Sequence, residues 1–127
     1  MRPLPIVLAL TAGLVLTGCS DAIDTATKVK DCATLATDLA SSGLNRVPTQ
    51  AEAEATAKKL QDRVESLDSQ EVKDAASDLS SKLEALRAAA ASKDAAAVQR
   101  AVEDARDSAR AAAETCGIPV SQLVPGL

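Results

Sequence analysis

The side chains with the most distinctive chemistry in this chain of 127 residues are its three cysteines, Cys19, Cys32 and Cys116. The sequence contains no histidine, tryptophan, tyrosine or phenylalanine. Without histidine, Ser–His and Cys–His nucleophile pairs are excluded, and so are zinc sites built on histidine or clustered cysteine. We therefore expect the cysteines to undergo covalent modification and cross-linking rather than to catalyse a reaction.

Cys19 ends a short N-terminal sequence with a distinct pattern. Arg2 is followed by an uncharged apolar run over residues 4–16, and Leu16-Thr17-Gly18-Cys19 closes it. A basic start, a short apolar run and small residues after it are typical of a secretory signal peptide. The run of about 13 residues is shorter than the ~20 residues that a membrane span needs.

Leu16-Thr17-Gly18-Cys19 resembles the lipobox of bacterial lipoproteins, in which an aliphatic residue and two small residues precede a cysteine. In that family the cysteine thiol receives a diacylglycerol and a dedicated signal peptidase cuts before it. The resemblance implies that residues 1–18 are removed and that two acyl chains on Cys19 anchor the protein at the extracytoplasmic face of the cell membrane. The alternatives are an ordinary signal peptide with a chance cysteine and a buried N-terminal helix.

If Cys19 is lipidated, two thiols remain, Cys32 and Cys116. Both fall on apolar faces of expected helices, and an extracytoplasmic compartment permits disulfides. A Cys32–Cys116 bridge would close a loop of about 85 residues, which the chain-entropy model values at ~4.6 kcal/mol. The bridge requires the first helix to lie beside the C-terminal part of the last helix. Residues 41–48 must then span the remaining distance to the start of the second helix. The alternative is two free buried cysteines.

The other polar clusters have simpler explanations than catalysis or metal binding. The acidic residues of 100–110 alternate with arginine at helical spacing, which predicts a solvated, ion-paired face. Ser80-Ser81-Lys82 and Ser92-Lys93 could suggest a Ser–Lys nucleophile, but Ser92 suits a helix cap and Ser81 a helix surface. No Asp-x-Asp-x-Asp-Gly calcium loop occurs. We therefore predict no catalytic, cofactor-binding or metal site and no enzymatic activity.

The charge of the chain argues against polyanionic partners. Its 14 basic and 18 acidic residues give a formal net charge of −4, and loss of Arg2 with residues 1–18 makes this −5. Phosphate binding requires clustered lysine and arginine, so we expect no nucleic-acid partner.

Helical elements must position the cysteines, and apolar residues recur at helical spacing in four stretches. The first runs from about Val29 to Ser42. Thr49 and Glu52 match a capping box at the start of the second, and Asp68 offers a similar start for the third. Ser92 is expected to cap the fourth.

The apolar faces of the four expected helices consist of small and aliphatic side chains. Asp31 and Asp38 are expected to point away from the apolar face of the first helix. The predicted core faces are Val29, Cys32, Leu35, Ala36 and Leu39; Ala53, Ala57, Leu60, Val64 and Leu67; Val72, Ala76, Leu79, Leu83, Leu86 and Ala90; and Val98, Ala101, Ala105, Ala109, Ala112 and Cys116. Gly43 and Gly117 suit the left-handed residues that end helices.

These patterns predict an all-α protein, a small antiparallel up-down bundle of four helices, or of three long helices and a short one, with an alanine-rich core. The chain divides into a lipoprotein signal peptide (1–18), a lipidated N-terminus and tether (19–28), the bundle (29–117) and an apolar tail (118–127). The tether is expected either to fray or to continue the first helix. The tail is expected to pack into a groove between helices; the alternative is that it docks onto a partner.

The expected function follows from the anchor and the missing catalytic residues. We expect a membrane-anchored extracytoplasmic lipoprotein that acts as a non-enzymatic helical binding or spacer module of the cell envelope, with an envelope protein as a possible partner. The alanine- and aspartate-rich usage also resembles that of small lipoproteins of high-GC Gram-positive bacteria. The alternatives are a subunit or accessory of an envelope enzyme and a self-associating helical bundle.

Overall fold

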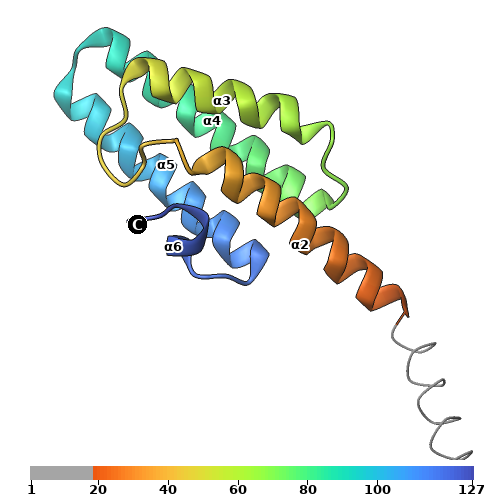
Figure 1. Cartoon of the computed structure of the whole chain (residues 1–127). Coiled ribbons are helices and arrows are strands. Elements are labelled where there is room, and N and C mark those ends of the chain that lie inside the picture. Colours follow the sequence, from red (N-terminus) through yellow and green to blue (C-terminus); the bar gives the residue numbers. More distant parts are fainter. Residues whose placement is uncertain (1–18) are drawn as a thin grey trace, which may run out of the picture.

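The computed structural model describes residues 19–127, with side chains from residue 26 onward, and this part of the chain consists of helices joined by turns. The helices are α2 (Cys19–Leu39), α3 (Gln50–Val64), α4 (Gln70–Ser92), α5 (Ala95–Cys116) and α6 (Val120–Leu123). Figure 1 shows α2 to α5 running alternately up and down, with α6 folded back at the end of α5. The all-α bundle predicted from the sequence is confirmed, and the expected signal peptide lies outside the described residues.

Helix α4 lies at the centre of the bundle, packed against α3 on one side and α5 on the other. The buried face of α5 is made of alanine and serine with one larger side chain, Val102. Small side chains let helices approach closely, and the leucines of α4, such as Leu79 and Leu83, fill the space that the alanines leave. The predicted alanine-rich seam is therefore present, and leucine supplies most of the buried volume.

Helix α2 is longer than predicted and turned about its axis. It continues without a break through residues 19–28, so that the segment expected to be a tether continues the first helix, which was one of its two alternatives. Val29 is 63% exposed instead of buried, while Asp31 and Asp38 lie in the interior. At 3.6 residues per turn, the buried face is rotated by roughly 60° toward the two aspartates. Both predictions for these side chains are wrong, because the aspartates find hydrogen-bond donors on other elements.

The turn between α4 and α5 corrects another prediction. The N-cap of α5 is Asp94, whose carboxylate accepts hydrogen bonds from the backbone N–H groups of Ala96 and Ala97. Ser92 is the last residue of α4 and donates its hydroxyl to the carbonyl of Ala89. An aspartate is as good an N-cap as serine, and it also suits the positive end of the helix dipole.

The C-terminal tail packs against the bundle. Gly117, at φ 67°, ends α5 in the left-handed conformation expected of it, and the chain then reverses into α6. Leu123 is fully buried and Val124 is 2% exposed, and α6 lies against both α5 and α2. The tail therefore enlarges the core, and the prediction that it packs between helices is confirmed.

Candidate functional site

The disulfide between Cys32 and Cys116 joins α2 to the last residue of α5, with Cα atoms 5.9 Å apart. The predicted pairing is thus present in the structure. Its geometric requirement is also met. Arg106, midway along α5, already donates to the carbonyls of Leu44 and Arg46 at 2.8 and 3.1 Å. Helix α2 therefore ends beside the middle of α5. The connector between α2 and α3 (residues 40–49) spans the remaining distance along α5 to the start of α3.

The two cysteines of the disulfide are buried to different degrees. Cys32 is 6% exposed, whereas Cys116 is half-buried. A shallow pocket of about 350 Å³ adjoins it. The lining residues are Lys28, Val29, Glu114, Thr115, Cys116 and Gly117. Of the two bonded cysteines, Cys116 lines this pocket and Cys32 does not.

Asp31 is a buried carboxylate that organises the turn between α3 and α4. It is 2% exposed and accepts the backbone N–H groups of Asp68 at 3.0 Å and Ser69 at 2.7 Å. Ser69 is the N-cap of α4 and makes no side-chain capping hydrogen bond. The predicted cap formed by Asp68 and Glu71 is therefore wrong, because a carboxylate from α2 takes its place.

Asp38 is the second inward-facing carboxylate of α2. Its side chain is 7% exposed, and it accepts a hydrogen bond from Nε of Arg63, near the end of α3, at 3.1 Å. The guanidinium is about half exposed, so it keeps part of its hydration while it neutralises the buried charge. The pair fastens α2 to α3 close to the turn that Asp31 holds.

The predicted capping box at the start of α3, formed by Thr49 and Glu52, is confirmed. Its Glu52 carboxylate has a clearly lowered pKa. The Glu52 carboxylate accepts two hydrogen bonds from the Arg46 guanidinium and one from the backbone N–H of Thr49. The hydrogen bonds from Arg46 and then from Thr49 lower the pKa of Glu52 to about 2. Glu52 raises the pKa of Arg46 in turn. The lowered pKa of Glu52 is therefore explained by its role in capping α3 and pairing with Arg46.

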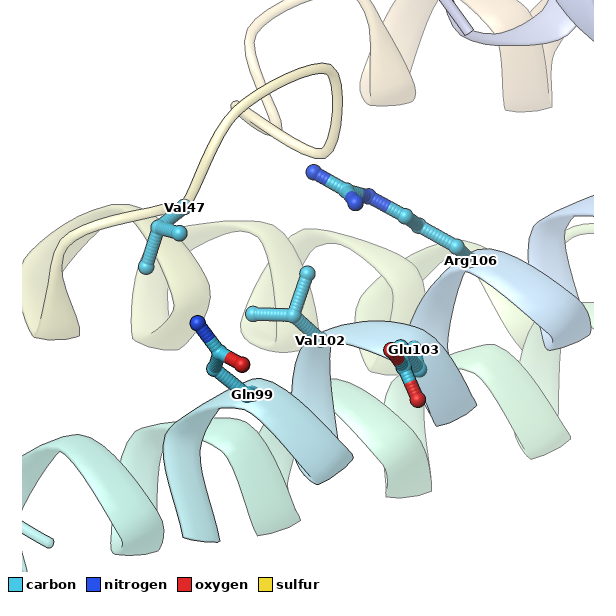
Figure 2. A pocket seen from close by; sticks show the side chains of 5 residues that line it. All are labelled: Val47, Gln99, Val102, Glu103 and Arg106. Carbon is cyan, nitrogen blue, oxygen red and sulfur yellow. The ribbon is translucent and has the colours of Figure 1, made fainter. Parts of the chain in front are cut away.

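A second hollow, of about 170 Å³, lies where the connector meets α5. Figure 2 shows Val47 and Val102 facing one another across it, with Arg106 reaching toward the connector. Gln99 and Glu103 complete the lining. Val47 is 53% exposed and so presents an apolar side chain to solvent here. The hollow is shallow and of mixed polarity, which suits a protein contact better than enclosure of a small molecule.

Two buried serines, Ser80 and Ser108, have structural roles. Ser80 donates to the carbonyl of Ala57 at 3.1 Å and so joins α4 to α3. Ser108, which sequence reasoning did not single out, donates to Asp78 at 2.6 Å and joins α5 to α4. The signal that could have identified Ser108 is its position on the alanine stripe of α5. A hydroxyl on a buried face needs a partner, because an unpaired buried polar group is costly.

The described part of the chain holds neither a metal-binding cluster nor a membrane-spanning helix. Within it, no group of three or more histidine, cysteine, aspartate or glutamate side chains is arranged to hold a metal ion. None of the described helices is long and apolar enough to cross a membrane. The side chain of Cys19, the expected lipidation site, lies outside the described residues.

Comparisons of the chain with protein-family models, with curated proteins and with solved structures find no match.

Proposed function

We propose that this chain is a lipoprotein held at the extracytoplasmic face of the cell membrane by a diacylglycerol on Cys19. Its helical body is a non-enzymatic module that binds or spaces components of the cell envelope. The observation that carries the proposal is Leu16-Thr17-Gly18-Cys19 at the end of an uncharged apolar run. The side chains required for lipoprotein processing occur there in the required order and position.

The form of α2 supports the spacer role. This helix begins at Cys19 and continues to Leu39, and its first turns extend past the ends of the other helices in Figure 1. Lys28 pairs with Glu71 of α4 at 2.7 Å. The nine residue-to-residue steps from Cys19 to Lys28 cover about 14 Å at the helical rise. A lipid on Cys19 would therefore carry the body on a short helical strut.

Intact mass measured on protein purified from membranes tests the anchor. We expect a chain that starts at Cys19 and carries acyl groups. The variant Cys19→Ala should lose the acyl mass and retain residues 1–18. Thr17→Ser keeps a small residue at its position and should be processed normally. An unmodified wild-type chain would refute the proposed anchor.

Photo-crosslinking in cells separates binding from spacing. Val47 is the exposed apolar side chain at the hollow shown in Figure 2, so a photoreactive residue there should trap a protein partner if the module binds one. Lys59, on the exposed surface of α3, is the matched control position. A discrete adduct at position 47 alone would favour binding, and absence of adducts at both positions would favour spacing.

A further inference from the structure

The attachment of α2 differs from that of the other long helices. Helix α4 approaches α3 on one side and α5 on the other closely along alanine-containing seams, whereas α2 makes far fewer close backbone approaches to any of these helices. Its side chains Leu35 and Leu39 reach the core, and α6 covers part of it. Helix α2 therefore depends on a few side-chain attachments, of which the bond from Cys32 to Cys116 is the only covalent one described.

The two cysteines of this bond differ in exposure. Cys116 lies in the last turn of α5 and lines the pocket of about 350 Å³, while Cys32 is 6% exposed. Thiol–disulfide exchange requires an attacking thiolate to reach one sulfur in line with the bond. Lys28 lines the same pocket, one helical turn before Cys32, and its ammonium pairs with Glu71 of α4 at 2.7 Å.

We propose that the Cys32–Cys116 disulfide is a redox latch on α2, opened by a dithiol protein that attacks Cys116 through this pocket. A thiolate of the dithiol protein bonds to the Cys116 sulfur, and Cys32 leaves as a thiolate and takes up a proton. The second thiol of the partner then displaces Cys116, which is also protonated. The chain gains two electrons and two protons, and the partner's dithiol becomes a disulfide.

Opening the latch removes the covalent restraint on α2 and leaves the seams of α3, α4 and α5 intact. Local opening of a weakly joined element needs less free energy than global unfolding. Helix α2 therefore separates from the remaining helices, and α6, which packs on both α2 and α5, loses the part of its contacts that α2 provides. Because α2 starts at Cys19, the latch would change how the body is held relative to its N-terminus. The latch itself does not depend on lipidation of Cys19.

Amide hydrogen exchange on the full-length product isolated from cells, with and without dithiothreitol, tests the latch. We expect exchange in α2 and α6 to become roughly 100- to 1,000-fold faster on reduction, the range expected when the loop constraint is lost. Exchange in α3, α4 and α5 should change far less. Equal acceleration in all helices, or unchanged exchange in α2, would overturn the proposal.

A trapping experiment tests the side of attack independently. A dithiol protein whose second cysteine is replaced by serine should form a mixed disulfide that peptide mapping assigns to Cys116. Adducts on Cys32 would overturn the proposed direction. The double variant Cys32→Ser, Cys116→Ser should show fast α2 exchange that dithiothreitol does not alter. Cys19→Ala should respond to dithiothreitol like the wild type, so that failure of the lipid anchor and failure of the latch are distinguishable.

Discussion

The carboxylate of Asp31 accepts a hydrogen bond from the backbone N–H of Ser69 at 2.7 Å, so that a side chain of α2 organises the start of α4. The two residues are 38 positions apart in the sequence. The same carboxylate accepts the N–H of Asp68. The hydrogen bonds of the turn between α3 and α4 are thus supplied by a third helix, α2.

Replacing Asp31 with alanine should destabilise the protein by about 2–3 kcal/mol, because two backbone donors lose a charged acceptor in a buried site. Asp31→Asn keeps one acceptor oxygen and should cost less. Urea unfolding of the three proteins measures both effects. The exposed residue Asp104 is the control, and Asp104→Ala should change stability by no more than ~0.5 kcal/mol. Equal losses for Asp31→Ala and Asp104→Ala would show that the buried carboxylate has no special role.

The pair formed by Asp38 and Arg63 should show measurable coupling. A double-mutant cycle with Asp38→Ala and Arg63→Ala is expected to give about 1–2 kcal/mol, because the carboxylate is buried and loses its donor when Arg63 is removed. The pair of Asp107 and Arg110 is the control, since both side chains are more than half exposed. Its coupling should stay below ~0.5 kcal/mol. A coupling for Asp38 and Arg63 as small as that of the control contradicts the prediction.

The C-terminal tail should contribute to the stability of the whole body. Leu123→Ala is expected to cost about 2–4 kcal/mol, because the side chain is fully buried and its removal leaves a cavity. Gln122→Ala, at an exposed neighbouring position, should be close to neutral. Deletion of residues 120–127 should lower the melting temperature at least as far as Leu123→Ala. An unchanged melting temperature would mean that the tail is free to serve a partner instead.

The stability that Glu52 contributes should depend on pH in a defined direction. Its pKa is about 2 in the folded protein, below the ordinary value of 4.5, so this contribution is present above pH 4.5 and is lost as the pH falls toward 2. Arg46→Gln removes the largest cause of the shift. Wild type should therefore exceed Arg46→Gln in stability near pH 6, and the difference should vanish near pH 2. Denaturant unfolding across this range measures it.

Arg100→Gln controls for the loss of one positive charge elsewhere on the surface. Its effect on stability should not follow the titration of Glu52. A stability difference between wild type and Arg46→Gln that persists unchanged at pH 2 would mean that Arg46 acts through contacts other than the Glu52 carboxylate.

Local features of this protein were predictable from the sequence, because residues within one or two helical turns determine them. The capping box of Thr49 and Glu52 depends on positions three apart, and the left-handed Gly117 depends on its missing side chain. Helical periodicity likewise identified the apolar faces of α3, α4 and α5. The pairing of Cys32 and Cys116 was predictable on the further premise that Cys19 is modified.

Tertiary structure decided the surroundings of the charged residues. Periodicity assigns a charge to solvent, yet Asp31 and Asp38 face the interior, because the burial cost is offset by donors from the α3–α4 turn and from Arg63. Those donors are 25 to 38 positions away along the chain, so no local pattern contains them. The rotation of α2, and with it the exposure of Val29, follows from the same hydrogen bonds.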